Sequence, residues 1–339
     1  MSTLWCGLGG LTYYPRPDQA ADVRGFLDRC ADLGVGSLRF YFGFFHLNHP
    51  TVFRLEMGER PFAPEGALAS FHLYPLSGWD PFRELVEGAH ARGISVVGYT
   101  SPDYQGALQP NPHSPLQEKL PQLFLSDFAN QHPGWWTRDP QGRDALSRDG
   151  YVVLSLHFPE VRRHLVDTLS RLTQEQGLDG LELEWLCGSG PARPHGAEAD
   201  APYATSVTHF VRQTREALSA ETGLSTAVTD DLEAGRAWSY EWDRWAGENL
   251  IDSLVLRHRA RDPGEIASRV RAARERVGPQ VQLISQLNCW WETGFRDIAA
   301  LREAAAAARG AGADVVGLYR ADSVEALGLW PALAEIGGT

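Results

Sequence analysis

The sequence predicts an α/β protein made of a single (β/α)8 barrel, a TIM barrel over residues 1–339, with long loops after strands 2, 3 and 4. Two observations support this fold class. Eight short β-rich runs alternate strictly with eight amphipathic helical patterns, which is the element order of such a barrel. The long segments all follow strands, whereas the helix-to-strand connections are mostly two to four residues long. Barrel active sites form on the strand-to-helix side, so these loops indicate the functional face.

The predicted strands are β-branched and aromatic runs at residues 4–11, 37–42, 94–100, 178–185, 224–230, 251–257, 281–288 and 313–319. The predicted helices cover residues 18–33, 81–92, 159–176, 203–222, 234–248, 263–277, 295–309 and 323–336. Asp80 and Asp262 each precede a proline, a pattern typical of helix N-termini. Four glycines are expected to end helices in a left-handed conformation: Gly34, Gly93, Gly177 and Gly223.

A doubly wound parallel sheet is the competing α/β fold. Such a sheet normally carries a glycine-rich phosphate turn between its first strand and the following helix. The segment GLGG at residues 7–10 does not open a helix. The barrel is therefore favoured.

The composition excludes several classes of protein. Hydrophobic residues make up 43% of the chain, which is too high for a disordered protein. The net charge of −12 opposes binding to nucleic acid or to anionic membranes, and no run approaches the ~18 apolar residues of a membrane span. The four cysteines are widely spaced and the first residues lack a signal-peptide pattern, so a cytoplasmic location is expected.

The fourth predicted strand, DGLELEW at residues 179–185, carries the most informative carboxylates. Alternation places Glu182 and Glu184 on one face and the leucines with Trp185 on the other. Because the leucine face should pack against helices, both glutamates should point into the barrel. Glu182 lies deeper and is interpreted as the partner of an inward Arg39. Glu184 lies at the carboxyl end of the strand, where reacting groups are found, and is predicted to be catalytic.

The fifth predicted strand ends in an acidic pair, Asp230 and Asp231. One of the two is expected to cap the following helix, and the other to serve as the second catalytic carboxylate. Asp230 is preferred because it extends the strand directly. Glycoside hydrolysis uses two carboxylates separated by ~5–5.5 Å in retaining enzymes or ~6.5–9.5 Å in inverting enzymes. The sequence does not choose between these separations.

Polar and aromatic residues also follow the other strands, and together they resemble the lining of a sugar site. Glu292, after the seventh strand, is a rival carboxylate. The predicted substrate-binding residues are Trp5, Arg39, Tyr41, Tyr99, Asp103, Trp185, Gln286, Asn288, Trp290 and Arg320. The chain contains 11 Trp residues, and more than half of those beyond the needs of a core are expected at this face.

No cofactor or metal is expected. The histidines lie mostly in predicted loops without an HxH strand motif, which argues against a metal-dependent hydrolase. The single lysine, Lys119, lies in a predicted loop, which argues against a Schiff-base aldolase. The predicted partner is a carbohydrate substrate, and the oligomeric state stays open.

Several sequence blocks resemble one known group of proteins. The blocks are LWCG at 4–7, WDPF at 79–82, AHARGI at 89–94, HPGW at 132–135, FPEVR at 158–162 and DGLELEW at 179–185. They are similar to motifs of the glycosyl-hydrolase-like ten proteins, which are barrel proteins related to bacterial glycosidases. The acidic strand departs from the group's pattern, because Glu182 replaces a histidine and Glu184-Trp185 replaces a pair of aspartates.

The resemblance and the strand-end residues together predict a glycoside hydrolase that acts on a glycan or oligosaccharide. One carboxyl group would protonate the leaving oxygen, and the other would attack the anomeric carbon or activate water. Two alternatives stay open: a carbohydrate-binding barrel without catalysis, which the loss of a carboxylate at Trp185 favours, and a different barrel hydrolase.

Overall fold

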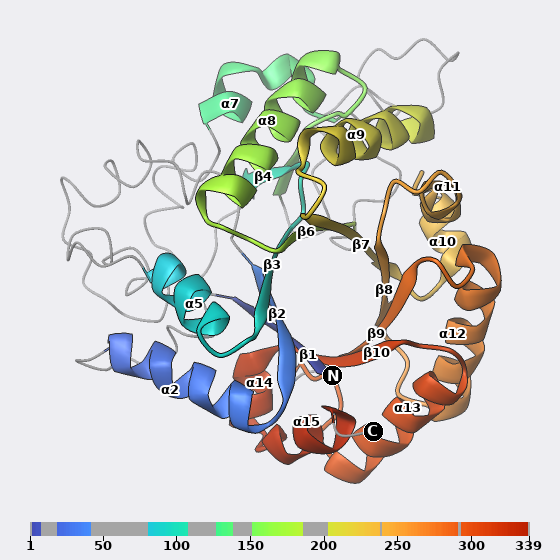
Figure 1. The fold of residues 1–339 in the computed structure, drawn as a ribbon. Helices are drawn as coiled ribbons and strands as arrows, with labels where there is room; N and C mark the ends of the chain where they lie inside the picture. The colour runs from blue at the N-terminus through green and yellow to red at the C-terminus, as the bar shows by residue number, and fades with distance from the viewer. Residues whose placement is uncertain are drawn as a thin grey trace.

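Eight parallel strands close into a barrel in the order β1-β10-β9-β8-β7-β6-β3-β2, as Figure 1 shows along the barrel axis. The structure is a computed structural model, and it describes residues 2–7, 19–41, 81–107, 127–137, 151–185, 203–237, 239–290 and 293–337. The barrel strands are β1 (Ser2–Gly7), β2 (Val35–Tyr41), β3 (Ser95–Thr100), β6 (Gly180–Glu184), β7 (Gly223–Thr229), β8 (Ser253–His258), β9 (Gln282–Asn288) and β10 (Val315–Tyr319). The predicted fold class is confirmed.

The helices surround the barrel (Figure 1). They are α2 (Gln19–Asp32), α5 (Pro81–His90), α8 (Pro159–Glu175), α9 (Tyr203–Ala217), α10 (Leu232–Ala237), α11 (Trp242–Gly247), α12 (Pro263–Val277), α13 (Ile298–Gly310), α14 (Ala321–Ala326) and α15 (Trp330–Gly337). Two predicted single helices are each broken into two. Ser239 (φ 72°) follows α10, and Gly328 (φ 65°) follows α14, and a left-handed residue ends a helix.

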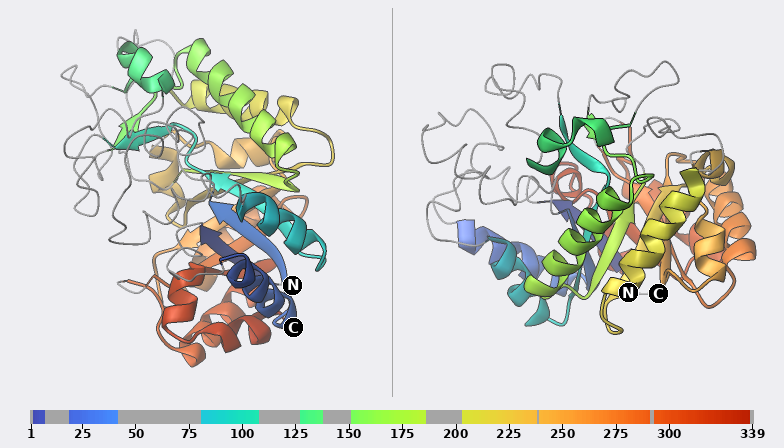
Figure 2. Two further views of the ribbon diagram at one scale, coloured as in Figure 1. Left: turned by 90° about the vertical axis from the view of Figure 1, so that its left-hand side faces the viewer. Right: turned by 90° about the horizontal axis from the view of Figure 1, so that it is seen from above.

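The loop after β3 contains structure that the sequence pattern did not indicate. β4 (Tyr104–Ala107) pairs antiparallel with β5 (Tyr151–Val153), and the short helices α7 (Asp127–Gln131) and η3 (Pro133–Trp135) lie between them in sequence. Figure 2 shows β4 and α7 at one end of the barrel. The predicted long loops after β2 and β6, at residues 42–80 and 186–202, lie outside the described residues.

The predicted helix boundaries hold at most of the described positions. The Asp262 side chain accepts a hydrogen bond from Glu265 N at 2.8 Å at the start of α12. Gly34, Gly93 and Gly177 have φ values between 65° and 70°. Gly223 is different, because it begins β7 and its φ is not positive; the prediction of a left-handed Gly223 is wrong. Asp80 lies outside the described residues.

Three aspartates form the same backbone clamp at the amino ends of alternate strands. Each precedes a strand and accepts a hydrogen bond at 2.7 Å from a backbone N–H of the preceding barrel strand: Asp179 from Val96, Asp252 from Leu224 and Asp314 from Leu283. A basic side chain from a neighbouring helix pairs with each carboxylate: His90, Arg215 and Arg274, respectively. The clamps fix the strand register on which the strand-end residues depend.

The buried apolar side chains form two clusters. The larger cluster lies between the strands and the helices and includes Leu181 and Leu183 of β6. The smaller one fills the barrel interior and contains Trp5, Tyr99 and Tyr319 among others. The three cysteines within the described residues, Cys6, Cys30 and Cys289, are buried and form no disulfide with one another. No described helix is both long and apolar enough to cross a membrane.

Candidate active site

Glu184 lies at the carboxyl end of β6 and points into the barrel, as its alternation with the leucines predicts. Its carboxylate forms an ion pair with Arg257 of β8, and its exposed fraction is only 6%. Burial raises the pKa of the Glu184 carboxyl above its ordinary value, Arg257 opposes that shift, and the nearby Glu182 adds to it. A glutamate in such surroundings keeps its proton to a higher pH than an exposed glutamate does.

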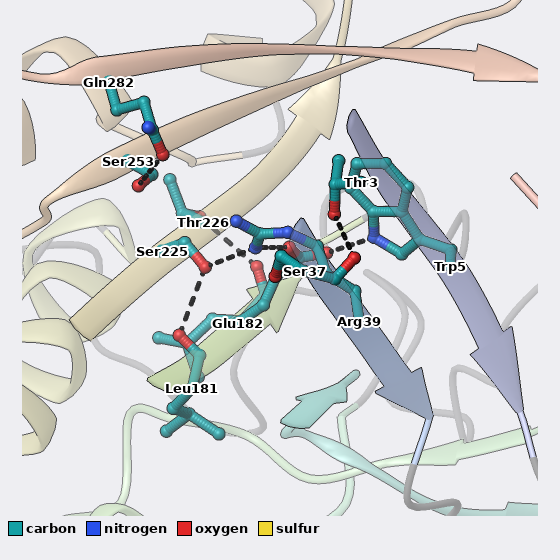
Figure 3. A network of polar contacts seen from close by, with 11 residues as sticks. Thr3, Trp5, Ser37, Arg39, Leu181, Glu182, Ser225, Thr226, Ser253 and Gln282 are labelled. Atoms are coloured by element: carbon teal, nitrogen blue, oxygen red, sulfur yellow. Dashed lines mark hydrogen bonds and ion pairs between the residues drawn. The ribbon is translucent and has the colours of Figure 1, made fainter. Parts of the chain in front are cut away.

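Glu182 lies one layer deeper and is held by two residues, Arg39 and Trp5 (Figure 3). Arg39 forms an ion pair with the Glu182 carboxylate, and the Trp5 indole N–H donates to Glu182 Oε1 at 3.1 Å. Arg39 also donates to Ser225 Oγ at 2.9 Å. The ion pair confirms the predicted contact between Glu182 and Arg39. Glu182 is 1% exposed, so the pair is buried.

Gly317 on β10 makes room for the Trp5 ring in this layer. A Cβ atom at Gly317 would lie 2.7 Å from Trp5 Cζ3, closer than real contacts allow. Trp5 and Arg39 are therefore packed within the barrel beneath Glu184. Both were predicted to bind substrate; in the structure both bind the Glu182 carboxylate, and neither is more than 5% exposed.

One residue of the acidic pair after β7 caps the following helix, as predicted. The Asp231 carboxylate accepts a hydrogen bond from Ala234 N at 3.1 Å and caps α10. Asp230 is 6% exposed, and its Oδ2 lies 3.2 Å from Nδ1 of His258. His258 is fully buried, and its Nε2 has no hydrogen-bond partner among the described residues.

Asp103 lies after β3, in the loop that leads to β4. It is 6% exposed, and burial raises its pKa from 3.8 to about 7, with a hydrogen bond from its own backbone N–H acting in the opposite direction. Burial raises the pKa of Tyr203 at the start of α9, and the charge of Asp103 adds to that shift. A carboxyl group with this pKa carries a proton for a large part of the time at neutral pH.

Aromatic rings and guanidinium groups alternate at the ends of β8, β9 and β10. The Arg257 guanidinium lies over the Tyr319 ring at 4.1 Å from its centroid. Arg320 lies over the Trp290 ring at 5.1 Å. Trp290 packs against the interior cluster that contains Tyr319, so the two stacks are neighbours.

The remaining predicted substrate-binding residues take several positions. Trp185 is 3% exposed in the outer core, where its ring stacks on Tyr240 with centroids 5.1 Å apart. Its prediction as a sugar-binding residue is wrong, because Trp185 shares the leucine face of β6. Asn288 holds its own loop: Oδ1 accepts from Trp290 N at 2.9 Å, and Nδ2 donates to Thr293 Oγ1 at 3.2 Å.

Gln286 and Tyr99 are buried, and Gln286 Oε1 has no hydrogen-bond partner among the described residues. The Tyr41 side chain and the whole of Glu292 lie outside the described part of the chain. In that part, no group of three or more His, Cys, Asp or Glu side chains is arranged to hold a metal ion.

Sequence reasoning missed Arg257 and His258. Both stand at the end of β8, next to each other, and each holds one of the two carboxylates predicted to be catalytic. The alternation of β8 could have predicted that Arg257 points into the barrel, since Val255, two residues earlier, also points inward. No local pattern indicated that His258 would meet Asp230, because that contact joins two strand ends.

A cavity of ≈ 280 Å³ opens at the opposite, amino-terminal end of the barrel. Arg39 contributes to its lining, so the Trp5–Glu182–Arg39 layer lies between this cavity and the strand ends that carry Glu184. Its other polar lining residues include Thr3, Ser37, Ser95, Ser225, Ser253 and Gln282.

Solved structures with a similar barrel fold include domains of several glycoside hydrolases. The glycoside hydrolase domain of PgaB (BpsB) from Bordetella bronchiseptica is 16% identical with a TM-score of 0.58, and the match covers 98% of this chain and 97% of that one. A maltogenic alpha-amylase from Thermotoga neapolitana is 13% identical with a TM-score of 0.52, over 94% of this chain and 67% of the other.

An alpha-galactosidase from Lactobacillus brevis is 12% identical with a TM-score of 0.55, over 98% of this chain. This chain spans only 41% of the length of that galactosidase. At these identities the likeness shows the fold alone. No protein-family model matches the sequence and no curated protein matches it, so the resemblance to the glycosyl-hydrolase-like ten proteins stays a prediction.

Proposed function

We propose that the protein is a glycoside hydrolase that cleaves glycosidic bonds at the carboxyl end of its barrel. The observation that carries the proposal is Glu184: a buried glutamate at the end of a barrel strand, paired with Arg257, with a raised pKa. Strand ends at this face supply the reacting groups of barrel enzymes. The resemblance to the glycosyl-hydrolase-like ten proteins supports the same reaction class.

Glu184 would act with a second carboxyl group across the sugar. Asp230 is the first candidate. Glu184 pairs in register with Ala227, and Asp230 follows Ala227 by three residues, which is about 10 Å along a strand at ~3.3 Å per residue.

Asp103 is the second candidate for the acid. Its pKa of about 7 suits a group that must hold a proton before it protonates the leaving oxygen. In this arrangement Glu184 would be the base, and Asp230 would fix the end of β8 through His258.

Four proteins test the proposal: the wild type and the variants Glu184→Gln, Asp230→Asn and Asp103→Asn. Each is incubated with a panel of glycans, and the release of reducing ends is measured. We expect Glu184→Gln to abolish turnover while binding persists. Of the two aspartate variants, the one that lacks the acid should recover activity on substrates with a good leaving group, such as nitrophenyl glycosides. Unchanged hydrolysis in Glu184→Gln would overturn the site assignment.

A carbohydrate-binding barrel without catalysis is the second candidate function. The observation in its favour is that both predicted catalytic carboxylates have protein partners, Arg257 for Glu184 and His258 for Asp230. A binding protein would show saturable glycan affinity with no release of reducing ends by the wild type, and titration calorimetry beside the hydrolysis assay separates the two functions.

A further inference from the structure

The two guanidinium groups at the barrel mouth each lie on the face of an aromatic ring. Arg257 covers Tyr319 at 4.1 Å, and Arg320 covers Trp290 at 5.1 Å. Tyr319 and Arg320 are consecutive in the chain, and Trp290 follows β9, the strand between β8 and β10. The two cation–aromatic stacks thus lie side by side over three adjacent strands.

These stacks reduce the aromatic surface on which a sugar ring could stack. A pyranose stacks through its C–H groups on an open aromatic face, as a protein's own apolar groups do. A guanidinium already occupies one face of Tyr319 and one face of Trp290. The rings therefore act as supports that orient cations, an arrangement that strengthens when water is excluded.

The neighbouring carboxylates do not oppose an incoming anion as strongly as their number suggests. Glu182 is paired with Arg39, Glu184 with Arg257, and Asp230 with His258. An arginine therefore offsets the charge of each of the two glutamates where it stands. Arg257 has a side chain that is 18% exposed, against 7% for Glu184, so the cation of that pair is the more accessible partner.

We propose that this site takes an acidic glycan, in which a uronic-acid carboxylate lies against the Arg257 and Arg320 guanidinium groups. A planar guanidinium carries five N–H donors in a fork that matches a carboxylate in two-point contact. A sugar hydroxyl uses only one such donor at a time, so a neutral glycan gains little from two oriented guanidinium groups. The inference rests on the proposed glycosidase function and names its substrate class.

The test compares one glycan in two chemical forms. Oligosaccharides of polygalacturonate, polyglucuronate and polymannuronate are each prepared as such and after reduction of their carboxylates to primary alcohols. Binding is measured by titration calorimetry and hydrolysis by reducing-end release, at low and high salt. We expect at least one native form to exceed its reduced form in affinity or kcat/KM by about tenfold or more, with a preference that falls as salt rises.

Arg320→Gln should lower that native-to-reduced ratio toward one. Arg261→Gln is the matched control, because Arg261 is an exposed arginine just beyond β8 and its loss should leave the ratio unchanged. Equal or better handling of all three reduced glycans would overturn the inference, as would an unchanged ratio in Arg320→Gln. If no glycan is hydrolysed, the proposed glycosidase function fails, whereas the binding ratio still decides the substrate class.

Discussion

Arg257 and His258, adjacent residues at the end of β8, hold two different carboxylates: Arg257 pairs with Glu184 of β6, and His258 with Asp230 after β7. Consecutive strand residues point to opposite faces. Arg257 faces the interior of the barrel, whereas the His258 side chain points away from the interior and contacts Asp230. One short segment thus fixes both carboxylates that the sequence singled out.

Removal of Arg257 should change the pH profile of the proposed activity. Arg257 lowers the pKa of Glu184, whereas burial and Glu182 raise it. With Glu184 as the base, Arg257→Gln removes the lowering influence, so the acidic limb of the kcat/KM profile should move to higher pH, and kcat/KM at neutral pH should fall by about tenfold or more. Arg261→Gln should leave the profile in place. A fall in rate without movement of that limb would contradict this account.

The Glu182–Arg39 pair should show strong coupling in stability. Breaking a buried ion pair from one side leaves a buried charge, and should cost about 3–5 kcal/mol for Arg39→Met or for Glu182→Leu. The double variant removes both charges and should cost clearly less than the sum of the single changes. The free energy of unfolding from urea titrations measures all three variants. Additive losses would mean that the two charges are not coupled.

Asp103 should make folding less favourable as the pH rises. Its pKa is raised in the folded protein, to about 7 from 3.8, so between these values the unfolded chain loses a proton that the folded chain keeps. The contribution of Asp103 to stability therefore falls from about pH 4 to about pH 7, by on the order of 4 kcal/mol at most.

Asp103→Asn removes this dependence, and the difference in unfolding free energy between wild type and variant should move in favour of the variant across that range. Asp167→Asn, at an exposed position on α8, provides the control. A wild-type-minus-variant difference that does not vary with pH would show that Asp103 is ionised normally.

Trp185 and Trp290 should respond in opposite ways to substitution. Trp185→Leu removes a ring packed against Tyr240, Phe210 and Trp245, so it should lower stability by about 2–4 kcal/mol without changing KM. Trp290→Leu removes the support of Arg320, and it should raise KM with a smaller loss of stability. Thermal unfolding and steady-state kinetics of both variants separate packing from binding. A raised KM in Trp185→Leu would show that Trp185 does contribute to substrate binding.

The aspartate clamps predict a purely structural effect far from the mouth. Asp252→Ala leaves the Leu224 backbone N–H without its acceptor and breaks the ion pair with Arg215. We expect a loss of about 1–2 kcal/mol in unfolding free energy, with kcat and KM unchanged. Asp167→Ala serves as the exposed control; a change in KM for Asp252→Ala alone would link the strand register to the site.

Patterns within single elements predicted much of this molecule. The two-residue alternation of β6 placed both glutamates inward, and an acidic residue before an apolar helix predicted the cap at Asp231. The same alternation placed Trp185 on the leucine face of β6. Trp185 was nevertheless predicted to bind substrate, because it lies at the end of a strand.

Contacts between elements were beyond the reach of such patterns. The Asp230–His258 contact joins residues 28 positions apart, and the break after α10 depends on a serine with positive φ, a conformation with no strong sequence signal. β4 and β5 are four and three residues long, too short for alternation to distinguish them from a loop.

The Trp5–Glu182–Arg39 layer divides the barrel interior into an upper half that carries Glu184 and a lower half that holds the amino-terminal cavity. Side chains that line the lower half, such as Val97 and Val315, lie on the far side of this layer from the proposed active site. The lower half is therefore a place where mutations can accumulate under selection for folding alone. Stability and the proposed substrate choice are therefore open to separate evolution, and to separate engineering, at the two ends of one barrel.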